Sequence, residues 1–117
     1  MRISHYRDMA PDTEVPGVAL RTVVGENDGA LPFAMRVFEV KPGASTPFHS
    51  HPWEHAVYVL SGKGEVEGPQ SATPLEPGSV AFIPSQERHH FTNMGERPFC
   101  FVCVIPTQGK DNPKCDV

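Results

Sequence analysis

The feature that most constrains this chain is the close spacing of its turn-forming residues. Ten glycines and thirteen prolines punctuate the 117 residues, and only short apolar segments lie between them. A typical helix needs roughly ten uninterrupted residues, whereas a typical strand needs roughly five. No ten-residue stretch shows a helical period free of these breakers. The sequence therefore predicts an all-β domain, a sandwich or barrel built from short strands.

The expected strands follow from where the apolar runs begin and end. They are expected at residues 18–24, 33–40, 46–51, 55–60, 65–67, 79–83, 89–93 and 99–105. Residues 68–74 are expected to form a loop. The length is that of one domain, 1–117, with a core barrel at about 18–105 and a polar C-terminal tail at 106–117.

The charge pattern excludes several classes of partner. Ten basic against fourteen acidic residues give a net charge of −4, and no basic run is present, which argues against a nucleic-acid or anionic-membrane surface. No apolar run approaches the roughly 18 residues of a membrane helix. The N-terminal residues lack the apolar core of a signal peptide, and the cysteines are few, so we expect a cytoplasmic protein.

Two of the three cysteines form a C-x-x-C pattern. Cys100 and Cys103 lie within a strong β run, where residues three apart face opposite sides, so their sulfurs should diverge. We therefore expect buried core residues rather than a redox or metal-binding pair. Nothing in the pattern assigns a role to Cys115.

The histidines are the strongest functional signal, because five of the six fall in two short clusters. His49 and His51 are two apart on an expected strand, so both imidazoles should point to one face. Pro52 and Trp53 then form a corner, and His55 opens the next strand, which can run beside the first. If the sheet closes into a barrel, His89 can supply a fourth nitrogen. Imidazole ligands suit divalent transition metals.

At these positions the sequence resembles the cupin family. The first cupin motif is a glycine, five residues, H-x-H, three or four residues, a glutamate, six residues and a glycine. Gly43, His49, His51 and Gly62 match it, while His55 stands at the position of the glutamate. The resemblance therefore implies four histidine ligands instead of three histidines and a carboxylate, as in a subgroup of small single-barrel cupins.

The second cupin motif is also present. It is a glycine, five residues, P-x-G, two residues, a histidine, three residues and an asparagine. Gly78, Pro84, His89 and Asn93 match it, and Gln86 replaces its second glycine, a change expected to alter only the loop. The resemblance covers about residues 33–105. It implies a small double-stranded β-helix, or jelly-roll barrel, with one metal in its mouth.

The resemblance implies a site with one divalent metal ion (Mn, Fe, Ni, Co or Zn) held by His49, His51, His55 and His89. His90 competes with His89 for the last position. Motif spacing favours His89, and neighbours in a strand cannot both face inward, so His90 should point outward. Four neutral imidazoles leave the charge of the ion uncompensated, which favours an anionic ligand, and two coordination positions stay open.

Other side chains near the expected site have simpler interpretations. Val57 and Val59 should share the face of His55, and Phe91 that of His89, as ordinary core residues. Phe48 and Trp53 are expected at the rim. Arg36 could bind a substrate anion, but a solvated strand position is the favoured interpretation. Tyr58 should face away from the metal.

Two classes of function stay open. The first is a metal-dependent enzyme, such as an isomerase, dioxygenase or lyase, acting on a small polar or anionic metabolite: a sugar, keto acid or dicarbonyl. The second is a non-catalytic small-molecule-binding or sensing protein that acts in trans, and a purely structural metal is a weaker third. A homodimer is expected, because small barrels of this kind pair through sheet edges.

Overall fold

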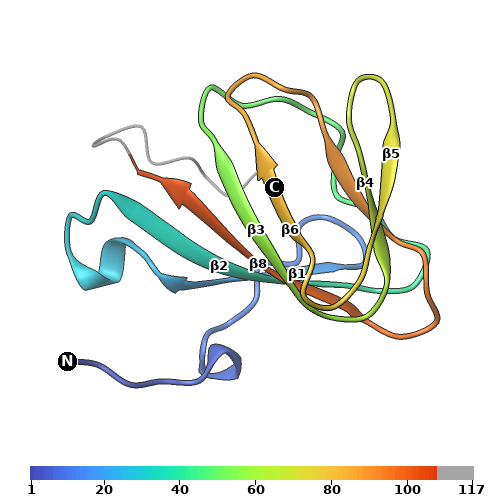
Figure 1. Ribbon diagram of the computed structural model, residues 1–117. Helices are drawn as coiled ribbons and strands as arrows, with labels where there is room; N and C mark the ends of the chain where they lie inside the picture. The colour runs from blue at the N-terminus through green and yellow to red at the C-terminus, as the bar shows by residue number, and fades with distance from the viewer. Residues whose placement is uncertain (108–117) are drawn as a thin grey trace.

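The computed structural model describes residues 1–107, which form two antiparallel sheets packed against each other (Figure 1). The expected tail and Cys115 lie outside these residues, apart from residues 106 and 107. The larger sheet contains, in spatial order, β1 (Val18–Val24), β2 (Phe33–Val40), β8 (Phe99–Pro106), β3 (His55–Ser61) and β6 (Val80–Ile83). The smaller sheet contains β5 (Ala72–Leu75), β4 (Gly64–Glu67) and β7 (His90–Asn93).

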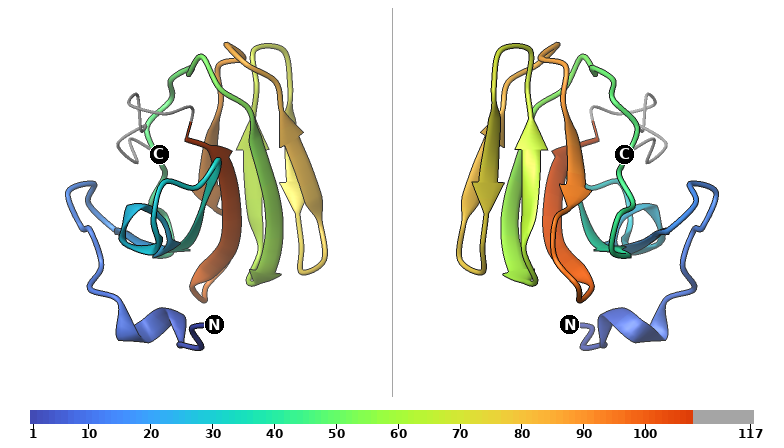
Figure 2. Two further views of the ribbon diagram at one scale, coloured as in Figure 1. Left: turned by 90° about the vertical axis from the view of Figure 1, so that its left-hand side faces the viewer. Right: turned by 90° about the vertical axis from the view of Figure 1, so that its right-hand side faces the viewer.

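The two sheets curve around a common interior, as the side views show (Figure 2). The only helical segments in residues 1–107 are the short 3-10 turns η1 (Tyr6–Asp8) and η2 (Glu26–Asp28). The expected all-β jelly-roll barrel is therefore confirmed. No helix among the described residues is long and apolar enough to cross a membrane.

Two expected elements differ in the structure. The segment at 46–51 is not a regular strand but contacts the end of the smaller sheet through isolated bridges, among them the bridge from His49 to His89. Pro47 has no N–H to donate, which interrupts a ladder at this point. Residues 72–74, expected to be part of a loop, form β5 together with Leu75, which was expected in the following turn. Pro74 is tolerated there because β5 lies at the edge of its sheet.

The core lies between the sheets and is dominated by phenylalanine. Strand β8 alternates, and the ring of Phe101 packs at its centre, with centroids 4.8 Å from Phe38, 4.7 Å from Phe91 and 5.2 Å from Phe99. All four side chains are buried. Rings packed at these distances stabilise the interior beyond their burial.

The strand register orders the inner face into rows that run from one end of the barrel to the other. Val40 pairs with Phe99 at one end, and Arg36 pairs with Cys103 toward the other. Cys103 also pairs with Val57 of β3, and His55 lies one inward-facing position further along that strand. The histidine end of the barrel is thus separated from the phenylalanine core by a row that contains Arg36 and Cys103.

Gly62, the last residue of the first motif, makes the turn between β3 and β4. Its φ is +82°, and a Cβ there would lie 2.3 Å from the carbonyl oxygen of Pro98. We expect Gly62→Ala to lower the free energy of unfolding by about 3 kcal/mol, from backbone strain plus overlap. Urea denaturation measures this. Gly43→Ala is the matched control, because Gly43 has a φ of +79° but open space around it. Equal losses in the two variants would contradict the overlap.

Candidate metal centre

The segment before β3 and the residue just before β7 place the histidines opposite one another. The backbone N–H of His49 donates to the carbonyl of His89 at 3.3 Å, and that of His89 donates to the carbonyl of His49 at 3.1 Å. Residues paired this way in antiparallel strands carry their side chains on the same face. The chain then turns at Pro52 and returns as β3, which begins with His55. Three separated segments therefore present histidines to one end of the barrel.

Three imidazoles meet at this end. His51, His55 and His89 are buried, and one ring nitrogen of each lies within 4.8 Å of the others. The ring centroids of His55 and His89 are 4.9 Å apart, and those of His51 and His55 are 5.3 Å apart. We call these three residues the histidine cluster. A spacing of this kind allows one cation to contact all three nitrogens.

The hydrogen bonds of the cluster favour a metal. Nδ1 of His89 lies 2.9 Å from the carbonyl oxygen of Glu87, which can only accept, so this nitrogen carries the hydrogen. Nδ1 of His55 lies 3.2 Å from the sulfur of Cys103. Nε2 of His55 is buried and has no hydrogen-bond partner among the described residues. A buried imidazole nitrogen without a partner is costly unless a ligand such as a metal ion occupies it, so the residues present fit a divalent transition metal.

Burial favours the uncharged form of two cluster residues, His55 and His89. Desolvation lowers the pKa of His55 from 6.5 to about 3, helped by the positive charge of Arg36 and by the neighbouring His89 and His51. Desolvation also lowers the pKa of His89, opposed by the carbonyl of Glu87. A neutral imidazole is the form that binds a metal. His55 and His89 are therefore ready to ligate at neutral pH without losing protons.

His49 and His90 lie outside the cluster. The ring of His49 is 4.9 Å from that of His51, edge to face, but its nitrogens are not within the 4.8 Å group. Nε2 of His90 donates to a carboxylate oxygen of Glu67 at 2.8 Å, and the ring of His90 stacks on Phe48 at 4.6 Å. The structure thus places His89 inward and His90 outward, and it leaves the four-histidine ligand set as a prediction.

Two aromatic residues flank the site in different ways. Trp53 stacks on His51, with centroids 4.6 Å apart and planes 5° from parallel, so it supports a cluster residue directly. Phe48 instead contacts His90 and the guanidinium of Arg88, away from the cluster. Tyr58 is half exposed on the outer face, as its place in β3 predicts.

The expectation that Arg36 is a solvated strand residue is wrong. Its side chain is only 1% exposed, and a guanidinium nitrogen donates to the sulfur of Cys103 at 3.3 Å. The signal was in the sequence, because Arg36 shares its parity in β2 with the buried residues Ala34 and Phe38. A bulky cation on an apolar face is the kind of residue that function, rather than packing, retains.

The sulfurs of the C-x-x-C pattern diverge, as expected for a strand. Cys103 faces the cluster, while Cys100 faces the other side, 3.7 Å from a carboxylate oxygen of Glu39. Both are free thiols and buried. Burial and the charge of Glu39 raise the pKa of Cys100. The contacts of Cys103 with His55 and Arg36 were not expected from the sequence, because strand parity cannot say which residue of a neighbouring strand lies opposite.

Gln86, which replaces a motif glycine, keeps the backbone conformation of a glycine. Its φ is +69°, the only positive value at a non-glycine residue in the described part of the chain. Its N–H donates to the carbonyl of His51 at 2.6 Å, so this strained turn holds a cluster residue in place.

We expect Gln86→Gly to raise the free energy of unfolding by about 0.5–1 kcal/mol, because relief of the left-handed strain exceeds the entropy cost of glycine. Gln86→Ala is the matched control, since it keeps a Cβ and should show no gain. Chemical denaturation of the metal-free proteins compares them. An alanine variant more stable than the glycine variant would contradict this account.

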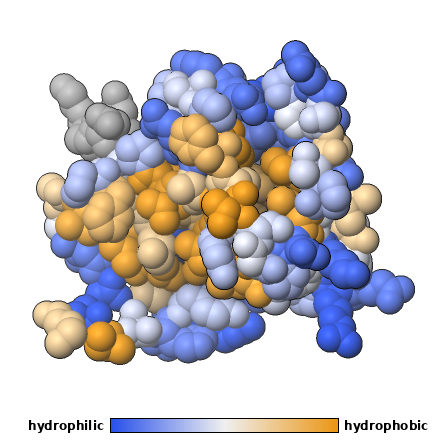
Figure 3. Space-filling model, viewed as in Figure 1, coloured by the Kyte–Doolittle hydropathy of each residue, from blue (hydrophilic) through white to orange (hydrophobic). Residues whose placement is uncertain are grey.

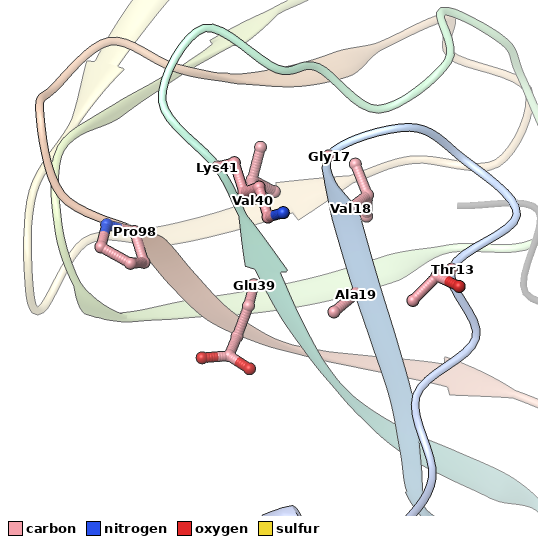
Figure 4. A pocket seen from close by; sticks show the side chains of 8 residues that line it. All are labelled: Thr13, Gly17, Val18, Ala19, Glu39, Val40, Lys41 and Pro98. Atoms are coloured by element: carbon pink, nitrogen blue, oxygen red, sulfur yellow. The ribbon is translucent and has the colours of Figure 1, made fainter.

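Two hollows differ in their relation to the cluster. A cavity of about 570 Å³ reaches His89 between β5 and β6, and its thirteen lining residues include Leu75, Phe82 and Glu87 but no lysine or arginine. A second pocket, of about 250 Å³, lies among Gly17, Glu39 and Pro98 where β1 begins and β2 ends (Figure 4). The register places the second pocket at the opposite end of the barrel. Only the first cavity communicates with a histidine.

Comparison with known proteins adds a family match and several relatives. A family model described as a cupin domain (Cupin_2) matches residues 36–105. The protein SchB of Streptomyces halstedii is 33% identical over 96 residues, which cover 81% of this chain and 70% of SchB. The glucose-6-phosphate isomerase of Thermococcus onnurineus is 31% identical over 93 residues, 69% of this chain. Those residues span about half, 49%, of the isomerase.

A solved structure agrees closely with the fold. It is that of the polyketide cyclase RemF from Streptomyces resistomycificus, with a TM-score of 0.85 and 32% sequence identity. The match covers 92% of this chain and 80% of RemF. The two chains are therefore similar in sequence as well as in the arrangement of their strands.

Proposed function

Because the chain belongs to the Cupin_2 family of cupin domains, we propose that it is a divalent-metal-dependent enzyme that cyclises a compound carrying carbonyl groups at alternate carbons. The observation that carries the proposal is the histidine cluster, one member of which, His89, lines a large cavity that has no lysine or arginine in its wall. A metal held by His51, His55 and His89 would act there as a Lewis acid that polarises carbonyl oxygens. His49 is proposed as the fourth ligand, since it shares a face with His89.

The cavity favours a carbonyl-rich, weakly charged substrate. Its volume of about 570 Å³ falls in the usual range for a metabolite site, and apolar side chains such as Leu75, Ala81 and Ile83 contribute to its walls. A phosphate group is normally held by lysine, arginine or a helix N-terminus. None of the thirteen lining residues is a lysine or arginine. This composition supports a polyketide-type substrate over a sugar phosphate, although isomerases of sugar phosphates are among the relatives.

One carboxylate is placed to move a proton. Ring closure joins the carbon between two carbonyl groups to a third carbonyl carbon of the same molecule. The first carbon must lose a proton, and the new hydroxyl oxygen must gain one, so no external oxidant or reductant is needed. Glu87 is the acidic side chain in the cavity lining, close along the chain to His89. We assign it the role of accepting the first proton and returning it to the hydroxyl.

The test is turnover of a linear 1,3,5,7-tetraketone, whose carbon 2 can close a six-membered ring onto carbonyl carbon 7, by the chain loaded separately with Zn, Co, Ni, Mn or Fe. We expect a cyclic product, detected by mass spectrometry, and at least a hundredfold slower reaction in Glu87→Gln, which keeps the side-chain shape. Glucose 6-phosphate and fructose 6-phosphate serve as competing substrates. Turnover of the sugar phosphates alone would overturn the substrate class. Saturable binding of the tetraketone without product would identify a non-catalytic binding protein instead.

We also propose a cytoplasmic homodimer. Both described cysteines are free thiols, in keeping with a reducing compartment. Exposed apolar side chains gather on the outer face of the larger sheet, over β3 and its edge strand β6 (Figure 3). They include Tyr58, Leu60, Val80 and Phe82, and Tyr58 pairs directly with Val80. A second copy of the same patch would cover these groups.

Sedimentation velocity tests the dimer. We expect the wild type to sediment as a dimer and Leu60→Lys, which places a charge in the patch, to shift it to monomer. Lys63→Glu is a control in the turn that follows β3, and it should leave the dimer intact. A wild-type monomer at micromolar concentration would contradict the proposal.

A further inference from the structure

Cys103 and Arg36 lie directly behind the histidine cluster, on the side away from solvent. Both belong to the inner face of the larger sheet, where they are paired across β8 and β2. Cys103 is 2% exposed and Arg36 is 1% exposed. Each is therefore inaccessible to a substrate and can act on the site only through its neighbours.

The contacts form a continuous chain that ends on a cluster residue. A guanidinium nitrogen of Arg36 donates to the sulfur of Cys103 at 3.3 Å. The same sulfur lies 3.2 Å from Nδ1 of His55. The guanidinium carbon also lies 5.2 Å from the ring centroid of Phe38, a cation–π contact that fixes the arginine against the core. The sulfur is thus held from one side by a charged donor and faces the imidazole on the other.

The hydrogen-bonding roles of the two nitrogens of one imidazole depend on each other. In neutral histidine, one ring nitrogen carries the hydrogen and the other offers the lone pair that a metal needs. His89 is fixed by the carbonyl of Glu87, the usual kind of partner. At Nδ1 of His55 the sulfur of Cys103 takes the place of such a carbonyl, at 3.2 Å.

We propose that Cys103, held by Arg36, is the positioning residue that directs Nε2 of His55 toward the metal. Nδ1–H of His55 donates to the sulfur, and this bond sets both the tautomer and the angle of the ring. The inference deepens the proposed function and rests on it. It also explains why an arginine is buried on an apolar face, since the guanidinium orients the sulfur that orients the imidazole.

The same strand provides a matched control. Cys100 is also buried, and it lies three residues away on the opposite face, where it contacts Glu39 instead of the cluster. Cys103→Ala removes the sulfur, while Cys103→Ser keeps a group that can accept from Nδ1. Cys100→Ala removes a sulfur of equal size without touching the cluster. Any general effect of losing a thiol from β8 appears in both alanine variants.

The first experiment uses the metal-free protein and long-range ¹H–¹⁵N correlation spectra of the histidine rings. We expect His55 of the wild type to be the Nδ1–H tautomer. In Cys103→Ala, His55 should become a mixture of tautomers. In Cys103→Ser and Cys100→Ala, it should remain the Nδ1–H tautomer. A His55 tautomer unchanged by Cys103→Ala would overturn the proposal. This measurement needs no metal, so it stays decisive even if the wild type binds none and the proposed function fails.

The second experiment measures Zn²⁺ affinity by competition with a chelator and the visible spectrum of the Co²⁺-loaded proteins. Loss of a residue that orients a ligand typically lowers metal affinity tenfold to a hundredfold. We expect that loss and a shifted Co²⁺ band in Cys103→Ala, recovery of most of the affinity in Cys103→Ser, and wild-type behaviour in Cys100→Ala. Equal affinities in all four proteins would contradict the proposal. If Cys103→Ala fails to fold, Arg36→Met takes its place, because it removes the donor that holds the sulfur of Cys103. We then expect Arg36→Met to lose Zn²⁺ affinity relative to Cys103→Ser.

Discussion

Replacing His55 by alanine is expected to lower the affinity for Zn²⁺ by roughly a thousandfold or more. Nε2 of His55 is buried and lacks a hydrogen-bond partner in the described structure, so its lone pair is available to a metal. Removing one of three or four ligands costs more than the tenfold to hundredfold effect of losing a residue that only orients a ligand. Chelator competition at pH 7 measures the change.

His90→Ala is the matched control for this variant. His90 is adjacent to His89 in the sequence, but it contacts Glu67 and Phe48 and not the cluster. Its loss should leave metal affinity within about twofold. Wild-type affinity in His55→Ala, or an equal loss in His90→Ala, would remove the basis for the proposed metal centre.

His49→Ala separates a three-histidine from a four-histidine site. If His49 is the fourth ligand, its loss should lower the affinity by a factor between those of His90→Ala and His55→Ala, because the three clustered nitrogens remain. If its effect equals that of His90→Ala, the ion is held by three protein nitrogens. The second result would correct the four-histidine ligand set without affecting the cluster itself.

The metal-free stability of His55→Ala checks that the loss is not one of folding. In the metal-free protein, a buried imidazole with an unsatisfied nitrogen costs free energy, so removing it should not lower the unfolding temperature greatly. A cooperative thermal transition close to that of the wild type would show that the lost affinity reflects a lost ligand.

Much of the fold followed from the sequence because the strands obey simple alternation. The limits of β1 and β2 are as expected, and His55, Val57 and Val59 share the buried face of β3. The turns are equally local, since Gly62 stands where a positive φ is required. Strand-breaking residues, alternation and turn geometry depend on neighbouring residues only, so the sequence alone predicts them.

What could not be predicted depended on pairing between distant strands. The bridge from His49 to His89 joins segments forty residues apart and gives an irregular segment in place of a strand. The row that aligns Arg36 with Cys103 is set by the register of β2 and β8. Because a charged residue is normally solvated, the residue type of Arg36 predicts an exposed side chain. Its parity in β2 predicts the buried position that the structure shows.

The histidine cluster could be predicted from the sequence in part. The spacing of His49, His51 and His55 indicated a common site, and the structure brings two of these three together with His89. The separation of His49 from the other nitrogens depends on side-chain rotation, which spacing does not determine. Likewise, the motif position of Gln86 suggested a simple loop change, whereas its backbone keeps the conformation of the missing glycine.

The buried histidines should make the stability of the protein depend on pH. The metal-free protein is expected to lose stability progressively as the pH falls from about 6.5 toward 3. Desolvation lowers the pKa of His55 from 6.5 to about 3 in the folded chain, and it lowers that of His89. Between these values the unfolded chain binds protons at its histidines while the folded chain does not. Stability therefore rises with pH through this window and falls with acidification.

We expect the unfolding temperature in the presence of a chelator to drop by roughly 10 °C or more between pH 7 and pH 4. Titration of carboxylates contributes at the lower end, so the comparison with His55→Gln isolates the histidine. Glutamine fills similar space but does not bind a proton, and its profile should be flatter between pH 6.5 and 4.5. Parallel profiles for the two proteins would contradict the role of His55.

Bound metal should leave this dependence nearly unchanged above about pH 4. An ion that ligates neutral imidazoles stabilises the folded state more the tighter it binds, and protons compete for the same nitrogens. Because desolvation lowers the pKa of His55 to about 3, protons compete with the metal in the folded protein only as the pH approaches that value. Saturating Zn²⁺ should therefore raise the unfolding temperature by a similar amount at pH 7 and pH 5, and the gain should shrink only toward pH 3. A gain that is already lost at about pH 6 would place the metal on histidines of ordinary pKa and not on the histidine cluster.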